Sequence, residues 1–269
     1  MTSRITTRVS AAVIAVGIAT AVGSVSANHS WGSYHWARTA NPFTLAVGDN
    51  VGSAWDSYLN TAISDWSAST VLNLTKVPGG TRPRNCKATT GRLEVCNDTY
   101  GTNGWLGVAR ISVSGTHITA ATTKVNDSYF NSSTYNTPAW RRLVMCQEVG
   151  HDFGLDHQDE NFSNPNLGTC MDYTNDPDGG GAYGPSNEHP NGHDYDQLIT
   201  IYGHRDSTST VGSFTAVTPQ DKENEPENWG QLVRSSRNGR VQIYDLDLGS
   251  GRRVVTHVFW ADPEGDRRR

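Results

Sequence analysis

The chain of 269 residues carries 22 lysine and arginine residues and 27 aspartate and glutamate residues, a formal net charge of −5 at pH 7. This acidic balance argues against a nucleic acid partner, since binding to phosphates needs a basic surface. After the N-terminal segment, no apolar run approaches the ~20 residues that a membrane-spanning helix requires. We therefore expect one domain with an appendage. The protein should be a monomer that does not insert into a membrane.

The N-terminal residues are typical of a secretory signal peptide. Arg4 and Arg8 precede an apolar run that ends in small residues suited to cleavage. The predicted organisation is a signal peptide over residues 1–27, a main domain over residues 28–205, and a polar linker with a β-rich extension over residues 206–269. We therefore expect the mature protein to be secreted and extracellular.

Apolar residues at helical spacing predict a long first helix over residues 55–66. A strand is predicted over residues 71–77, where a Pro-Gly-Gly sequence ends it. Two further strands are predicted over residues 105–113 and 118–125. Strands and helices together imply a mixed sheet flanked by helices, which is an α+β fold.

A second helix is predicted to begin at Thr137, which can cap it, and Pro138, which suits its first turn. Residues four apart on a helix share a face, so Gln147 and His151 should project side by side. The helix is followed by a glycine that can adopt a left-handed conformation, which would turn His157 back toward them. The whole run is Gln147-Glu148-Val149-Gly150-His151-Asp152-Phe153-Gly154-Leu155-Asp156-His157.

This run resembles the zinc-protease signature HExxHxxGxxH, with Gln147 in place of the first histidine. Residues 169–174 resemble the Met-turn of metzincins, and residues 194–203 are similar to the last catalytic-domain helix of matrixin-type members. The sequence Met-Asp-Tyr-Thr within residues 169–174 is similar to the Met-turn sequence of pappalysin-like members. The resemblance covers roughly residues 43–203 and is sharpest from residue 137 onward.

The resemblance implies a metzincin-like domain with a mixed twisted sheet, a long first helix, an active-site helix, a Met-turn and a C-terminal helix. It implies that His151 and His157 ligate Zn²⁺, that Glu148 activates a zinc-bound water, and that Met171 forms an apolar floor under the metal. The strand over residues 118–125 resembles the edge strand of the family that pairs with substrate. The implied activity is that of a secreted zinc metalloendopeptidase acting on peptides or proteins.

Gln147 complicates this interpretation, because an amide oxygen is a weaker zinc donor than an imidazole nitrogen. An even division of the ~10–16 kcal/mol of a structural zinc site gives about 3 kcal/mol per ligand, or roughly 100-fold in affinity. A substitute ligand could come from nearby residues, although none has a specific spacing: Asp156, Asp159, Glu160, His189 and His193. The alternative function is a catalytically impaired metzincin-like pseudoenzyme that acts as a secreted peptide- or protein-binding module.

Four cysteines in a secreted chain favour two disulfides, for which three pairings exist. Cys86 paired with Cys96 would close a short loop, and Cys146 paired with Cys170 would tie the active-site helix to the Met-turn. A rival interpretation makes Cys146 or Cys170 a thiolate ligand in place of the missing histidine.

Residues 175–191 are rich in Asp, Asn, Gly and Pro and predict a long surface loop. Its Asp176 and Asp178 could hold Ca²⁺, and a solvated loop without an ion is the alternative. Near the C-terminus, strands are predicted over residues 241–248 and 254–260, with a further strand at Leu232-Val233 and turns at Asn238-Gly239 and Gly249-Ser250-Gly251. Such a small β-meander buries little core alone, so we expect this appendage to pack on the main domain or on itself.

Overall fold

The computed structural model describes residues 29–180, 184–212, 215–216, 226–236 and 239–262. The signal peptide predicted over residues 1–27, and Asn238 of one predicted turn, lie outside the described residues. Among the helices of the described part, none is long and apolar enough to cross a membrane.

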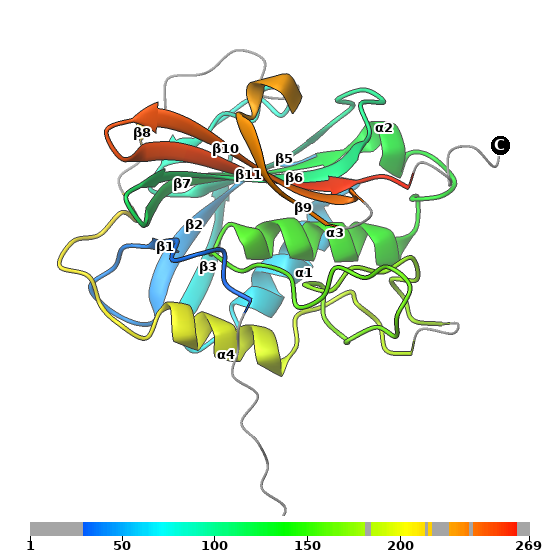
Figure 1. Ribbon diagram of the computed structural model, residues 1–269, viewed down its shortest axis with the longest axis horizontal. Helices are drawn as coiled ribbons and strands as arrows, with labels where there is room; N and C mark the ends of the chain where they lie inside the picture. Colours follow the sequence, from blue (N-terminus) through cyan, green and yellow to red (C-terminus); the bar gives the residue numbers. More distant parts are fainter. Residues whose placement is uncertain (1–28, 181–183, 213–214, 217–225, 237–238, 263–269) are drawn as a thin grey trace, which may run out of the picture.

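One mixed sheet dominates the molecule, with the strand order β3-β2-β5-β7-β6-β11-β10-β9 and with β1 beside β7 (Figure 1). The parallel pairs are β2 with β3, β2 with β5, β5 with β7 and β1 with β7, whereas β6, β9, β10 and β11 pair antiparallel. The strand bounds are β1 His35–Trp36, β2 Phe43–Asn50, β3 Leu72–Pro78, β5 Leu93–Asp98, β6 Trp105–Ser114, β7 His117–Asn126, β9 Gln231–Ser235, β10 Val241–Gly249 and β11 Arg252–Trp260; a separate ladder joins β4 Thr89–Thr90 to β8 Thr215–Ala216.

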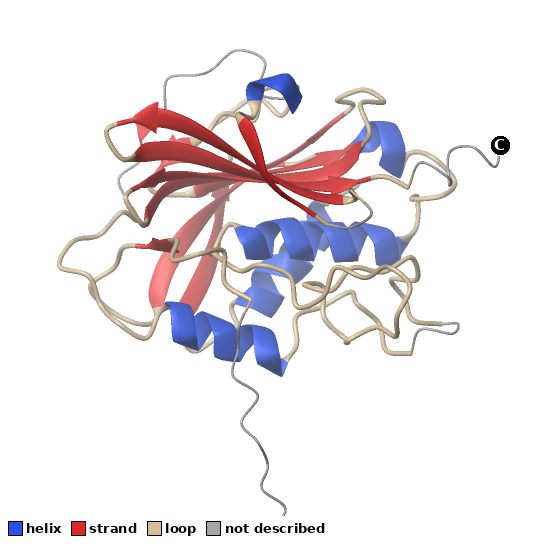
Figure 2. Cartoon of the chain, viewed as in Figure 1, coloured by secondary structure: helices blue, strands red, loops and turns tan. Residues whose placement is uncertain are grey.

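Helices cover one face of this sheet, with α1 and α3 directly beneath it and α4 farther from it (Figure 2). The helices are α1 Asp56–Trp66, α2 Asp127–Phe130, α3 Pro138–His151, α4 Gly192–Ile201 and the 3₁₀ helix η1 Pro226–Asn228. The main core lies between helices and sheet, where Trp36, Trp66 and Phe153 are fully buried. The expected α+β architecture, with a mixed sheet, a long first helix, a helix over the motif and a final helix, is confirmed.

Helix α1 forms where the apolar spacing predicted it, because Leu59, Ala62 and Trp66 recur on one buried face. The start of α3 is also as expected. The Thr137 hydroxyl accepts a hydrogen bond from the backbone N–H of Trp140 at 3.3 Å, and Pro138 occupies the first turn.

The prediction that residues 118–125 form the substrate-pairing edge strand is wrong. Strand β7 lies inside the sheet, between β5 and β6. Strand β6 is not an edge either, because β11 pairs with it from Arg252 opposite Ser114 to Trp260 opposite Trp105. The sequence did not reveal this, since a strand pattern identifies a buried face but not the neighbouring strand.

The C-terminal β-meander is present, with a turn at Gly249-Ser250-Gly251, but it is not a separate appendage. Its three strands extend the main sheet, so residues on both sides of the predicted boundary at residue 205 share one sheet. The division into residues 28–205 and 206–269 stays a prediction. Addition to an existing sheet explains how so short a segment becomes ordered, because β11 gains a complete ladder with β6.

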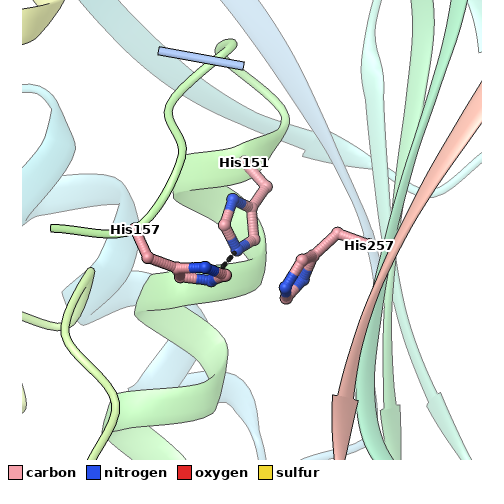
Figure 3. A group of neighbouring side chains, drawn as sticks. All are labelled: His151, His157 and His257. Atoms are coloured by element: carbon pink, nitrogen blue, oxygen red, sulfur yellow. Dashed lines mark hydrogen bonds between the residues drawn. The ribbon is translucent and has the colours of Figure 1, made fainter. Parts of the chain in front are cut away.

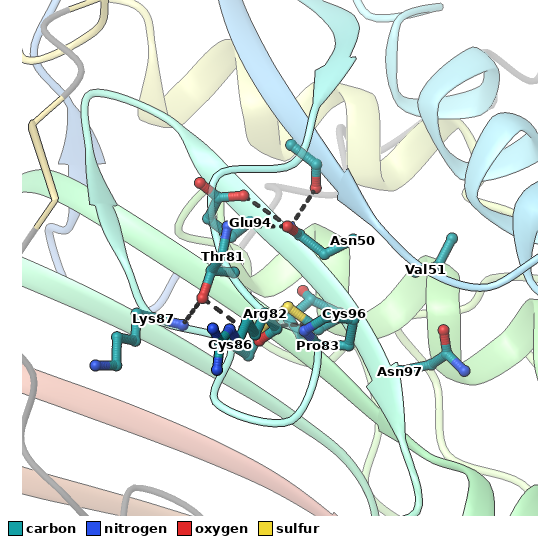
Figure 4. Close-up of a disulfide and its surroundings, with 12 residues drawn as sticks. Asn50, Val51, Thr81, Arg82, Pro83, Cys86, Lys87, Glu94, Cys96 and Asn97 are labelled. Atoms are coloured by element: carbon teal, nitrogen blue, oxygen red, sulfur yellow. Dashed lines mark hydrogen bonds between the residues drawn. A yellow bond between two sulfur atoms is a disulfide. The ribbon is translucent and has the colours of Figure 1, made fainter.

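Two disulfides are present, Cys86 with Cys96 and Cys146 with Cys170, as the sequence predicted. The first fastens the loop after β3 to β5, beside Asn50 and Glu94 (Figure 4). The second joins α3 to the Met-turn, which removes the thiolate-ligand interpretation of Cys146 or Cys170.

Candidate metal centre

Helix α3 places three polar side chains of the motif in the buried space below the sheet. Gln147 and Glu148 are completely buried, and His151 is 1% exposed. A helix normally turns such residues toward water, so their burial must be offset by specific partners. Those partners come from the loop after the helix and from the C-terminal strands.

The chain reverses after α3 at Gly154, whose φ is +90°. A Cβ at this position would lie 2.2 Å from the backbone oxygen of Tyr34, so close approach as well as backbone conformation requires glycine. The reversal returns His157 to His151, and their Nε2 atoms lie 2.9 Å apart (Figure 3). The two histidines predicted as metal ligands are therefore adjacent.

A third histidine, His257, completes the group and comes from β11 (Figure 3). One ring nitrogen from each of His151, His157 and His257 lies within 4.8 Å of the others, and all three residues are buried. Side chains alternate along a strand, so His257 points to the helix side together with Val255 and Phe259. We call His151, His157 and His257 the buried cluster.

The hydrogen bonds around His151 and His157 leave the inner nitrogens of these two rings free to act as ligands. Nδ1 of His151 lies 2.8 Å from the backbone oxygen of Leu155, which can only accept, so Nδ1 carries the proton and Nε2 is bare. Nδ1 of His157 lies 3.3 Å from Oε1 of Glu160, which likewise leaves Nε2 bare. Two bare nitrogens at 2.9 Å repel each other unless a cation joins them.

Neither His151 nor His257 supplies that cation as a proton at neutral pH. Burial, followed by the neighbouring His157, lowers the pKa of His151 to about 3. Burial, followed by His151 and His157, also holds the pKa of His257 well below the ordinary histidine value. Three imidazoles with oriented outer hydrogen bonds on two of them are a donor set that suits Zn²⁺, so the residues present fit this metal.

Glu148 lies beside the buried cluster, with Oε2 3.3 Å from Nδ1 of His257. Its Oε1 has no hydrogen-bond partner among the described residues. Burial raises the pKa of Glu148 well above its usual range, and the buried carboxyl of Asp152 raises it further. Strand β6 packs closely over this carboxyl, because a Cβ at Gly107 would lie 2.7 Å from Oε1 of Glu148.

Gln147 does not replace the missing histidine through its nitrogen, since Nε2 donates to the backbone oxygen of Cys170 at 2.7 Å. Its Oε1 is buried without a hydrogen-bond partner among the described residues. Met171 is fully buried, and its sulfur lies 2.8 Å from where a Cβ at Gly150 would stand, so the Met-turn packs directly under α3. Gln147 and Met171 thus connect the motif helix to the Met-turn.

The substitute ligands considered from the sequence do not join the buried cluster itself. His189 contacts Asp65, and His193 stacks on His29. Asp156 and Glu160 form with His157 another group close enough to hold an ion, but they face its outer Nδ1, and Arg234 of β9 pairs with both carboxylates. Neither Asp176 nor Asp178 belongs to a described group of side chains close enough to hold an ion, so the calcium site stays a prediction.

His257 was missed because nothing in its local sequence distinguishes it from other strand residues. It lies 109 residues after Glu148, beyond the reach of any motif spacing. The signal that could have found it is a polar residue at an inward position of an apolar strand, in Val254-Val255-Thr256-His257-Val258-Phe259.

No family model matches this chain, and no curated protein matches it either. Among solved structures, it is similar to that of myroilysin, with a TM-score of 0.38 and 15% identity over 66% of this chain and 100% of the other. It is also similar to high choriolytic enzyme 1, a hatching enzyme zinc-protease from Oryzias latipes, with a TM-score of 0.34 and 12% identity over 64% of this chain and 96% of the other. At these scores the similarities do not assign a function to the chain.

Proposed function

We propose that this protein is a secreted zinc-dependent metalloendopeptidase in which His151, His157 and His257 hold the metal and Glu148 is the general base. The observation that carries the proposal is the convergence of three buried imidazoles beside a buried carboxyl, 3.3 Å from one of them. Secretion is supported by the two disulfides, which persist in oxidising compartments.

When bound, Zn²⁺ supplies a Lewis acid that polarises a carbonyl group and lowers the pKa of water to about 7. Glu148 takes a proton only as a carboxylate, whereas burial favours its protonated form. A divalent cation nearby favours the carboxylate, so the metal and the base depend on each other. The orphan Oε1 of Glu148 has unused capacity to accept that proton.

Access of a substrate requires movement of the C-terminal strands. Glu148 is completely buried, and β11 occupies the backbone donors and acceptors of β6. Displacing β11 would leave β6 as an edge to which an extended peptide can add by strand pairing. Peptide-bond hydrolysis in our proposal therefore takes place in a form in which β11 has left β6 and withdrawn His257. His151 and His157 would keep the metal in that form, and the position vacated by His257 would be open to water and substrate.

A second candidate function is a metal-stabilised binding module without hydrolysis. The observation that favours it is the contact between Glu148 and His257, in which the carboxyl orients an imidazole instead of serving as a base. The Tyr173 hydroxyl, 3.2 Å from Nε2 of His257, adds a fourth polar group to the same site. Four protein donors around zinc are typical of structural sites, whereas catalytic sites keep one position open.

Hydrolysis of casein by the purified protein, with and without a chelator, separates the two functions. The endopeptidase predicts chelator-sensitive cleavage that disappears in Glu148→Gln, whose side chain cannot accept the proton. A wild type that binds zinc and cleaves neither casein nor a broad peptide library would exclude the endopeptidase.

A removable cross-link tests whether β11 must move. Val254 pairs with Ser112 across the two strands, and both are partly exposed, so Ser112→Cys with Val254→Cys should form a disulfide. We expect cleavage to be lost on oxidation and to return after mild reduction, with each single-cysteine variant as a control. Undiminished cleavage by the cross-linked protein would show that substrate reaches the site without displacing β11.

A further inference from the structure

A second group of metal-type side chains lies outside the buried cluster and shares no residue with it. It combines His35 of β1, His117 of β7, and His204 and Asp206 from the segment after α4, and we call these four residues the surface cluster. Strand β1 pairs with β7 so that His35 stands directly opposite His117. Side chains far apart in the sequence are thus brought to one point by three separate elements.

In the surface cluster, one donor atom from each of His35, His117 and Asp206 lies within 4.8 Å of the other two, and His204 adjoins this group. Oδ1 of Asp206 lies 3.4 Å from Nε2 of His35, 3.3 Å from Nε2 of His117 and 3.6 Å from Nε2 of His204. Nε2 of His204 lies 3.1 Å from Nε2 of His35. Charge-assisted hydrogen bonds are shorter, about 2.7–2.9 Å. Zinc bonds of about 2.0–2.1 Å place tetrahedral ligands roughly 3.3 Å apart, which matches the observed set.

Outer contacts orient two of these donors toward the common point. Nδ1 of His35 lies 2.8 Å from the backbone oxygen of Ser33, so its proton is on Nδ1 and Nε2 is bare. The other carboxylate oxygen of Asp206, Oδ2, accepts from the backbone N–H of Arg38 at 3.2 Å and from its Nη1 at 2.8 Å. Oδ1 is therefore left to face the three imidazoles, the outer-shell arrangement that metal ligands commonly have.

We propose that the surface cluster binds a second zinc ion through Nε2 of His35 and His117 and Oδ1 of Asp206, with the exposed His204 turning in as the fourth donor. Four protein donors make this a closed site, which is typical of structural zinc and leaves no position for a reacting molecule. The ion would hold the N-terminal segment and the segment after α4 against β7. Since β1 is only two residues long, its own ladder is a weak attachment.

A zinc ion in the surface cluster would also affect the helix that carries the motif. Trp36, next to His35, donates from Nε1 to the backbone oxygen of Asp152 at 2.9 Å, at the C-terminal end of α3. Fixing β1 therefore also fixes the end of the helix that carries the motif.

Zinc stoichiometry of the purified full-length protein, after dialysis against trace zinc, tests the proposal. We expect two zinc ions per chain in the wild type and one in the double variant His117→Ala with His204→Ala. Both side chains are at least one third exposed, at 35% and 53%, so folding should survive and circular dichroism verifies it. His189→Ala, which removes an exposed histidine outside both clusters, should retain two.

Cobalt(II) supplies an independent readout, because a tetrahedral site with nitrogen and oxygen ligands gives intense visible absorption. That absorption should fall by the contribution of one site in the double variant. In His204→Ala, zinc should bind to the surface cluster about 100-fold more weakly than in the wild type. An unchanged stoichiometry and cobalt spectrum in the double variant would overturn the proposal.

The metal of the proposed function is tested separately with His151→Ala. A single zinc that is lost in this variant and kept in the double variant would overturn the second site alone. A single zinc that is lost in the double variant and kept in His151→Ala would support the second site and remove the metal of the proposed function.

Discussion

The buried and surface clusters place similar donors in opposite environments. In the buried cluster three imidazoles have no solvent access and lie beside Glu148, a carboxyl whose pKa burial raises. In the surface cluster the carboxylate of Asp206 is paired with Arg38, and His204 is largely exposed. A buried carboxyl without a cationic side-chain partner, such as Glu148, lowers the stability of the fold, and this cost is expected where the carboxyl takes part in catalysis. A carboxylate paired with an arginine, such as Asp206, instead stabilises the structure.

The largest expected effect follows from the difference between these two carboxyl groups. Glu148→Gln should lower casein hydrolysis by at least 10²-fold, because general acid–base catalysis contributes about 10²–10⁴. Zinc content should stay unchanged, since Glu148 is not among the proposed ligands. Glu188→Gln, at a partly buried ion pair with Arg142, is the matched control and should retain activity. Equal losses in the two variants would remove the special role of Glu148.

The next effect concerns the strand that supplies the third ligand. His257→Ala should weaken zinc binding at the buried cluster by about 100-fold, since one imidazole ligand is lost. Competition with a chromogenic chelator measures this change, and His193→Ala is the control because His193 lies outside both clusters.

Gln147→His sharpens the same test, since it restores the signature histidine. It should recover most of the lost affinity when combined with His257→Ala and should change the wild type much less, because His257 already supplies a third imidazole. Affinity gains of equal size in both backgrounds would show that His257 is not a ligand.

The pH dependence of stability should also distinguish the buried carboxyl. A pKa raised above the usual 4.5 stabilises the folded state below that pH, and the stabilisation disappears as pH rises through the folded pKa. Glu148→Gln should therefore gain stability relative to wild type above pH ~4.5, by at most about 1.4 kcal/mol per pH unit. Urea unfolding of chelator-treated protein at pH 5 and pH 8 measures the gain. A constant difference between the two pH values would contradict the raised pKa.

The smallest effect concerns packing above Glu148. Gly107→Ala should destabilise the protein by about 1–3 kcal/mol, because the added Cβ would lie 2.7 Å from Cγ and Oε1 of Glu148. Gly192→Ala, where a Cβ meets nothing within 4 Å, should cost little. Thermal unfolding of both variants compares them, and equal midpoints would mean that β6 is loosely packed over the site.

Local patterns in the sequence were sufficient to predict the helix that carries the motif. The cap at Thr137, the shared face of Gln147 and His151, and the reversal at Gly154 depend on residues a few positions apart, and the structure contains all three. The disulfides could also be predicted, since four cysteines in a chain that we predict to be secreted leave only three pairings. Helical periodicity and turn chemistry are local physical constraints, so a sequence expresses them directly.

Tertiary structure alone decided which third histidine joins His151 and His157. His257 joins His151 because β11 pairs with β6 in one particular register, and a shift by one residue would turn it to the opposite face. The same applies to the surface cluster, which depends on the pairing of His35 with His117 and on the path of the chain after α4. Strand partners are chosen by burial over the whole sheet, so they leave no fixed spacing in the sequence.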